Sequence, residues 1–276
     1  MKIHLNMVSY RDIVSGLKHL GLDPARPVIV HASLSAFGDV QGGAETILGA
    51  LMAVVDALIM PTFTYRTMVI PEEGPEHNGI TYGSGRDLNR MAEIFVPSMP
   101  ADPLMGVIAE TLRKYPGSSR SRHPILSFSG VNSERSLQLQ SMQDPLAPIA
   151  DITEQGGWVL LMGVDHTVNT SIHYAEKLSG RKQFIRWALS PQGVLECPGY
   201  PGCSDGFEQA APQLSEITRQ VNIGEATVKA LPLQEMCTIL TQMLLDDPLA
   251  LLCSRPDCER CADVRYSVAQ PRKGHV

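Results

Sequence analysis

The chain has 276 residues, a formal net charge of −6 and six cysteines. This length favours one large domain with an appended piece over two full domains. The acidic balance argues against a nucleic-acid-binding protein, and fits either a cationic ligand or plain solubility. The N-terminus lacks the apolar region of a secretory signal, and the longest apolar stretch, residues 47–60, is too short to span a membrane. We therefore expect a cytoplasmic protein that binds neither nucleic acid nor membranes.

Helix and strand alternate in the first part of the chain. The predicted elements are a helix capped by Ser9 and ending at Gly21, a strand at 27–32, a helix that begins at Gly42 and Gly43, and a strand at 57–60. This order predicts a βαβ unit and a sheet that is at least partly parallel. Residues 66–103 follow with little periodicity and many Pro, Gly, Glu and Asn residues, which is typical of a binding loop.

The rest of the chain continues the alternation. The predicted elements are a helix from Asp102 to near residues 116–117, a strand at 125–131, helices near Ser133 and at 145–155, a strand at 158–164, a helix at 170–180, strands at 184–189 and 193–197, a helix at 213–221, a strand at 226–230 and a helix at 233–245. Because no clean linker is visible, we predict one domain over residues 1–276, with a cysteine-containing extension at 247–276.

Hydroxyl groups follow the first two predicted strands. The segment HASLS, residues 31–35, follows one strand, and PTFT, residues 61–64, follows the other. Such positions commonly line the ligand crevice of an open α/β sheet, although exit turns also carry hydroxyls. The glycine pair at 42–43 lets backbone N–H groups approach a phosphate at a helix start. The segment RSRHP, residues 120–124, suits a phosphorylated group or forms a solvated basic loop.

A histidine and two carboxylates are candidates for acid–base chemistry. His173 lies in the first turn of the helix that follows strand 158–164, and Glu176 lies three residues further on the same helix face. A carboxylate beside an imidazole fixes its tautomer and stabilises the imidazolium, as a general base requires; a structural pair is the alternative. Asp205 lies in a glycine-flanked turn, which either enters the site or is a plain Asp-Gly turn.

In their order, these segments resemble the aminoglycoside 3-N-acetyltransferase family. The matching segments, within residues 28–207, are HASLSAFGDVQGGAETILGAL, MPTFTY, DPLMGVIAETLRKYPGSSRSRHPILSFSGV, LLMGVDHTVNTSIHYAE and GCSDGF. The resemblance implies a three-layer α/β/α fold with a central mixed, largely parallel sheet. It also implies direct transfer of an acetyl group from acetyl-coenzyme A to the 3-amino group of a 2-deoxystreptamine aminoglycoside, which gives antibiotic resistance. The family also includes members that acetylate other amines.

The resemblance further implies the roles of individual residues. His173 would be the general base, held by Glu176 or Asp205, with Thr64 or a backbone N–H group as oxyanion donor. The residues expected around coenzyme A are Ser33, Leu34, Ser35, Gly42, Gly43, Thr62, Arg120, Ser121 and His123. The loop 66–103 would form much of the acceptor pocket. Acidic residues that would meet a cationic acceptor, or else remain exposed surface charges, are Glu72, Glu73, Glu76, Asp102 and Glu208.

The cysteines suggest a metal site. Cys253, Cys258 and Cys261 have the short gaps of structural zinc ligands, although they do not form paired CxxC motifs; unliganded thiols and a redox role are the alternatives. Candidates for a fourth ligand are Cys197, Cys203 and His275. Besides the acetyltransferase, two functions stay open: a zinc-dependent protein such as a hydrolase, and a non-catalytic acyl-coenzyme A-binding module. The sequence leaves the oligomeric state open, a homodimer included.

Overall fold

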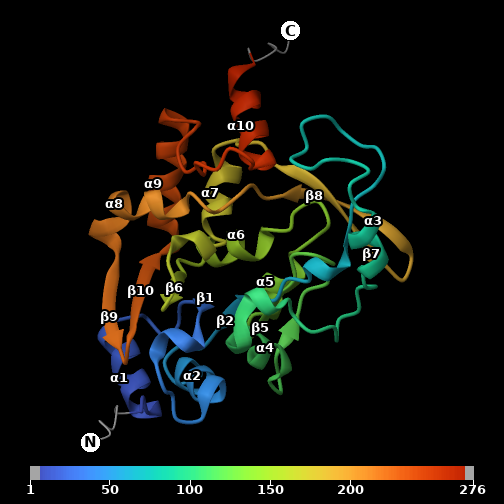
Figure 1. The fold of residues 1–276 in the computed structure, drawn as a ribbon. Helices are drawn as coiled ribbons and strands as arrows, with labels where there is room; N and C mark the ends of the chain where they lie inside the picture. Colours follow the sequence, from blue (N-terminus) through green and yellow to red (C-terminus); the bar gives the residue numbers. More distant parts are fainter. Residues whose placement is uncertain (1–6, 271–276) are drawn as a thin grey trace, which may run out of the picture.

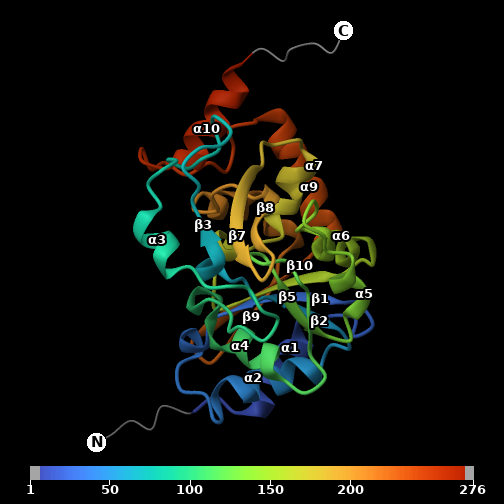
Figure 2. The same ribbon diagram turned by 90° about the vertical axis from the view of Figure 1, so that its right-hand side faces the viewer.

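A computed structural model describes residues 7–270. In this part of the chain the strands form a seven-stranded and a three-stranded sheet, and helices cover both faces of the larger one (Figures 1 and 2). In spatial order the larger sheet contains β4 (Ser119–Arg120), β5 (Phe128–Val131), β2 (Leu58–Pro61), β1 (Val28–Ala32), β6 (Trp158–Met162), β10 (Ala226–Pro232) and β9 (Arg219–Ile223). No helix of residues 7–270 is long and apolar enough to cross a membrane.

The centre of the larger sheet is parallel. β1 pairs in parallel with β2 on one side and with β6 on the other. β5 is antiparallel to β2 and to β4, and β10 is antiparallel to β6 and to β9. Strands β4, β2, β1, β6 and β9 therefore point one way, and β5 and β10 point the other way. The prediction of an α/β protein with a mixed, largely parallel central sheet is confirmed.

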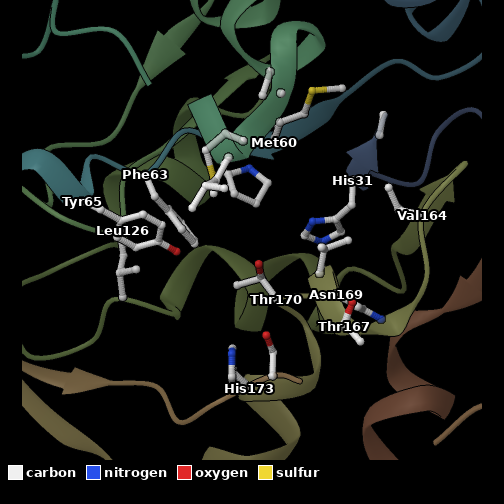
Figure 3. A pocket seen from close by; sticks show the side chains of 18 of the residues that line it. His31, Met60, Phe63, Tyr65, Leu126, Val164, Thr167, Asn169, Thr170 and His173 are labelled. Atoms are coloured by element: carbon white, nitrogen blue, oxygen red, sulfur yellow. The ribbon is translucent and has the colours of Figure 1, made fainter. Parts of the chain in front are cut away.

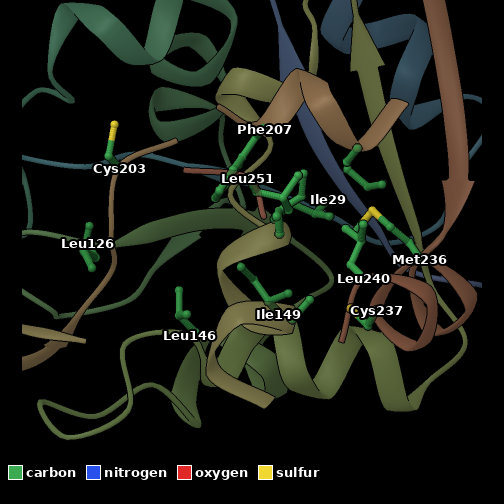
Figure 4. Packing of buried hydrophobic residues seen from close by; sticks show 14 of the residues in the cluster. Ile29, Leu126, Leu146, Ile149, Cys203, Phe207, Met236, Cys237, Leu240 and Leu251 are labelled. Atoms are coloured by element: carbon green, nitrogen blue, oxygen red, sulfur yellow. The ribbon is translucent and has the colours of Figure 1, made fainter. Parts of the chain in front are cut away.

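Alternate side chains of β1 face the two helical layers, as the pleat of a strand requires. Val28 and Val30 pack in an apolar core with α1 (Tyr10–His19), α2 (Gly43–Met52) and α4 (Gly106–Lys114). Ile29 packs on the opposite face with α6 (Ala147–Glu154), α7 (Ile172–Leu178) and α9 (Leu233–Asp246) (Figure 4). The remaining helices are α3 (Arg86–Met91), α5 (Glu134–Gln138), α8 (Ala211–Leu214) and α10 (Glu259–Ala269).

The irregular segment 66–103 contributes one strand to the smaller sheet and packs against it. Its strands, in order, are β3 (Met68–Val69), β7 (Phe184–Ser190) and β8 (Gly193–Tyr200). The side chain of Asn78 accepts from the backbone N–H of Ile185 (2.8 Å) and donates to its carbonyl (3.0 Å), as a neighbouring strand would. Asn89 bridges the N–H and carbonyl of Ile70 at 2.8 Å each. Side-chain amides therefore fix the segment together with the pairing of β3 and β7.

Near the C-terminus one prediction of local structure is wrong, and one helix was not predicted. The helix expected at 213–221 gives way to α8, a 3-10 turn at Ser215–Ile217 and strand β9. Gly224, with φ +58°, makes the turn that lets β9 pair with β10, so strand pairing overrides local helix propensity. Helix α10 was not predicted, because its buried residues are only Cys261 and Val264 and give no apolar stripe.

Candidate active site

A cavity of about 960 Å³ opens at the carboxyl ends of the parallel strands (Figure 3). This edge is where open α/β sheets bind ligands, and the volume suits a large organic molecule. Its lining includes residues at the ends of β1, β2 and β6, at the starts of α4, α7 and α10, and in the turn after β8. Among the lining residues are His31, Ser33, Leu34, Ser35, Met60, Phe63, Gly106, Val107, Val164, Asn169, Thr170, His173, Gly202, Ser204, Asp205 and Arg260.

His173 and Glu176 form a buried pair in the cavity wall. Helix α7 places both side chains on one face, and Nδ1 of His173 lies 2.6 Å from Oε2 of Glu176, with 9% and 6% of the two side chains exposed. The ring of Phe207, from the turn after β8, packs edge-on against the imidazole at 4.7 Å between centroids. The carboxylate thus fixes Nδ1 as the protonated nitrogen, which leaves Nε2 to accept a proton.

A third buried group completes this arrangement. Nη1 of Arg181 donates to Oε1 of Glu176 at 2.8 Å, and Nη2 donates to the carbonyls of Pro248 and Ala250 at 2.8 and 2.7 Å. Burial by itself would raise the pKa of Glu176. The hydrogen bond and charge of His173, together with Arg181, outweigh burial and hold that pKa below its usual value. Glu176 is therefore an anion at neutral pH, ready to stabilise an imidazolium.

A second histidine faces the cavity in neutral form. Nε2 of His31 is buried, with no hydrogen-bond partner among the described residues. Burial, and then the neighbouring His166, lower the pKa of His31 to about 3. His166 is held through its backbone N–H, which donates to Oε2 of Glu208 at 2.8 Å. Glu208, predicted to contact the acceptor, instead orders the loop that leads into α7 and is not among the cavity-lining residues.

The structure places Glu176, rather than Asp205, against the imidazole. Asp205 lines the cavity but is exposed and pairs with Arg255 at 3.2 Å. The hydroxyl of Thr64, proposed as an oxyanion donor, is buried and donates to the carbonyl of Pro124 at 2.6 Å. Thr64 is not part of the cavity lining, because its side chain is used to shape the turn before β5.

The residues expected around coenzyme A divide into two groups. Ser33, Leu34 and Ser35 line the cavity, and the two serine hydroxyls lie 3.1 Å apart. Gly42 and Gly43 start α2 outside the lining, and their φ values of +77° and +59° serve a tight turn.

The remaining predicted coenzyme A ligands bind other parts of the protein. Arg120 donates to the carbonyls of Pro97, Met99 and Thr62 and to the Ser127 hydroxyl, and burial, with the charge of Arg113, lowers its pKa to about 10. The side chains of Thr62, Ser121 and His123 are buried in hydrogen bonds to neighbouring loops and strands. In this structure Arg120, Ser121 and His123 hold the sheet edge and lie outside the cavity lining, whereas Arg122 is exposed.

The acidic residues of segment 66–103 lie away from the cavity. Glu72, Glu73 and Glu76 are exposed, and Asp102 accepts from the backbone N–H of Leu104 as a helix cap. Within the described residues, Met68 is the member of this segment that lines the cavity. The segment instead contacts the smaller sheet through Asn78 and α10 through Gly79. These contacts hold its acidic residues away from the cavity, where the sequence predicted them to meet the acceptor.

Sequence reasoning missed other lining residues. Gly106 and Val107 bring the N-terminal end of α4 to the cavity, and the signal was the DPLMG sequence, a cap followed by a glycine with φ +81°. His31 and Thr170 belonged to recognised segments without an assigned role. Arg260 had no local signal, because it reaches the cavity from an unpredicted helix.

Taken together, the fold and cavity define an α/β protein with a buried histidine–carboxylate pair in the wall of a large cavity. A family model described as aminoglycoside 3-N-acetyltransferase matches residues 29–245. The chain therefore belongs to this family of acyltransferases, and the resemblance inferred from the sequence segments is confirmed.

Curated relatives and solved structures agree with this assignment. Aminoglycoside N(3)-acetyltransferase III of Salmonella sp. is 27% identical over 244 residues, 77% of this chain and 82% of the relative. Aminoglycoside N(3)-acetyltransferase IV of Salmonella sp. is 28% identical over 261 residues, 87% and 89% of the two chains. The apoenzyme structure of aminoglycoside acetyltransferase AAC(3)-IVa superposes with a TM-score of 0.78 at 23% identity, covering 96% of this chain and all of the other.

Two similar structures contain ligands. A mutant of AAC(3)-IVa in complex with a gentamicin has a TM-score of 0.75 at 24% identity, covering 97% of this chain and 100% of the other. AAC-IIIb in a binary complex with CoASH has a TM-score of 0.70 at 22% identity, covering 87% and 97%. At these identities the superpositions show a shared fold.

Proposed function

We propose that this protein transfers the acetyl group of acetyl-coenzyme A to the 3-amino group of a 2-deoxystreptamine aminoglycoside and so gives resistance to that antibiotic. The observation that carries the proposal is the buried His173–Glu176 pair in the wall of a large cavity, in a chain of this family. Similar proteins solved with CoASH and with a gentamicin support the choice of donor and acceptor.

The proposed reaction is a direct transfer. The acceptor amine attacks the thioester carbonyl carbon while Nε2 of His173 accepts the amine proton. The carbon–sulfur bond then breaks, the acetyl group remains on the nitrogen, and the proton passes to the coenzyme A thiolate. No cysteine is among the described residues that line the cavity, which disfavours an acyl-cysteine intermediate. A positioned base of this kind contributes about 10²–10⁴-fold to the rate.

The two substrates would enter from different parts of the cavity. We assign the donor to the side where Ser33, Ser35 and the start of α4 meet, because hydroxyls and unpaired helical N–H groups suit phosphate and carbonyl oxygens. We assign the acceptor to the side of Asp205, whose exposed carboxylate suits an ammonium group. With the Thr64 hydroxyl already used, a backbone N–H group at 33–35 is the better candidate for the oxyanion donor.

A thiol-release assay tests the proposal. It uses acetyl-coenzyme A with a panel of 2-deoxystreptamine aminoglycosides, and compares wild type, His173→Ala and His19→Ala. His19 is an exposed histidine on α1 outside the cavity lining and serves as the matched control. We expect turnover in wild type and His19→Ala, and a fall of about 10²–10⁴-fold in His173→Ala.

Calorimetric titration with coenzyme A separates the alternatives. Full turnover in a folded His173→Ala protein would remove the proposed base. Coenzyme A binding without turnover of any aminoglycoside would keep the donor and replace the acceptor by another amine. Absence of both coenzyme A binding and turnover would overturn the proposed function.

A further inference from the structure

Four cysteines from two distant parts of the chain meet beside the cavity. Their Sγ atoms, from Cys203, Cys253, Cys258 and Cys261, all lie within 4.8 Å of one another, and all four residues are buried. Cys203 lies in the turn after β8 (Figure 4), whereas the other three flank the start of α10. None of the four takes part in the proposed transfer. The proposed reaction therefore gives no reason for four buried sulfur atoms to lie so close together.

We propose that these four cysteines, here called the thiolate cluster, bind one structural zinc ion. Zinc takes four thiolates in a tetrahedron at a Zn–S distance of ~2.3 Å, which places the sulfur atoms about 3.8 Å apart. The thiolate cluster is within about 1 Å of that spacing, so small side-chain rotations complete the geometry. Among the ligands considered from the sequence, Cys203 fills the fourth position; Cys197 does not belong to the cluster, and His275 lies outside the described residues.

The surroundings suit the two negative charges of a zinc tetrathiolate. Cys258 is the N-cap of the eleven-residue helix α10 and Cys261 lies in its first turn, where the helix dipole favours anions. Arg255 places a guanidinium beside the side chains of Cys258 and Cys253. A helix N-terminus and a guanidinium beside four convergent sulfur atoms suit an anionic metal complex.

The coordination defines the kind of metal site. All four positions are filled by protein sulfur atoms, and a closed tetrathiolate has no open position for water or substrate. Soft thiolate ligands select zinc over calcium or magnesium. The zinc ion would therefore hold structure rather than perform chemistry, and the proposal stands independently of the acetyl acceptor.

The thiolate cluster joins α10 to the cavity wall. Nη1 of Arg260 donates to the carbonyl of Gly202 at 2.8 Å, and both residues line the cavity. On the other side of α10, Asp263 accepts from the backbone N–H of Gly79 at 2.6 Å, which ties the helix to segment 66–103. A metal that fixes the start of α10 would thus help to fix both the cavity wall at Gly202 and segment 66–103.

Metal analysis of the purified full-length chain tests the proposal. The protein is prepared without chelator, and zinc is measured by inductively coupled plasma mass spectrometry. We expect about one zinc per chain in wild type, and at least a fivefold lower content in Cys258→Ser. Cys237→Ser is the matched control, because Cys237 is equally buried in α9 but outside the thiolate cluster, and it should keep the full zinc content.

Cobalt substitution of the wild type provides a readout that needs no variant. Co²⁺ added after zinc removal should give the absorption bands of a tetrahedral cobalt thiolate, and Zn²⁺ should displace it. A protein that contains no zinc, binds no Co²⁺ and reacts at six free thiols after denaturation would overturn the proposal. A disulfide between two members of the cluster, found by mass spectrometry of the unreduced protein, would also overturn it.

Discussion

Replacing Glu176 with glutamine separates the charge of this residue from its shape. The carboxylate lies 2.6 Å from Nδ1 of His173 in a site almost closed to solvent. At about 4 Å between charge centres and an effective dielectric constant of about 20, the carboxylate stabilises the imidazolium by ~4 kcal/mol. Glutamine retains a neutral hydrogen bond worth about 1 kcal/mol. The remaining ~3 kcal/mol corresponds to a fall in kcat of about 10²-fold.

Arg181→Gln is the matched control for this experiment. Arg181 contacts the same carboxylate on its other oxygen and does not line the cavity. Each variant breaks a buried ion pair and is expected to lose up to about 3–5 kcal/mol of the free energy of unfolding. Only Glu176→Gln removes the charge that faces the imidazolium. The thiol-release assay should therefore show a large loss of kcat in Glu176→Gln and a small one in Arg181→Gln.

Three measurements decide the outcome. Thermal unfolding sets an assay temperature at which both variants are folded, calorimetry gives their affinity for coenzyme A, and thiol release gives kcat and KM. An equal loss of kcat in both variants would mean that Glu176 acts through the fold. A kcat within about threefold of wild type in folded Glu176→Gln would refute the electrostatic reasoning.

Two further outcomes follow from buried groups outside the reaction. The pKa values of His31 and His123 are lowered by burial to about 3 and about 4, so below pH 6.5 the unfolded chain binds protons that the folded chain does not. In urea unfolding, the free energy of unfolding should decrease as the pH is lowered from 6.5 to 4, by up to about 1.4 kcal/mol per pH unit for each histidine. A free energy of unfolding that does not change over this pH range would contradict these pKa values. Replacing Arg120 with lysine should cost about 2–4 kcal/mol of stability in thermal unfolding with coenzyme A affinity unchanged, whereas a marked loss of affinity would return Arg120 to the donor site.

The sequence predicts contacts that depend on short spacing. Glu176 follows His173 by three residues on a helix, and that spacing by itself places their side chains on one face. Arg181 lies beyond the helix end, and its approach depends on the turn in which its N–H donates to the carbonyl of Glu176 at 3.0 Å. The pair was therefore predictable and the third member was not.

Arg120 shows the opposite case, because its partners in the structure are distant in the sequence. Two arginines and a histidine near a predicted strand are typical of an anion site. The acceptors that Arg120 finds are carbonyls at positions 62, 97 and 99, which are brought together only by the tertiary fold. A charged side chain is a stronger indication of a ligand when no group of the protein pairs with it. The sequence does not show which distant groups will pair with it in the fold.

The C-terminal extension belongs to the site rather than to its periphery. Arg181 binds Glu176 with one nitrogen and the carbonyls of Pro248 and Ala250 with another, so the orientation of the proposed base depends on residues beyond α9. Three members of the thiolate cluster lie in the same extension, and its helix supplies Arg260 to the cavity wall. The extension therefore contacts the partner of the proposed base and the proposed acceptor side of the cavity through separate sets of atoms. We expect loss of the proposed zinc ion to affect the proposed acceptor side first, through Arg260, because Arg181 binds carbonyls that precede the cysteines in the chain.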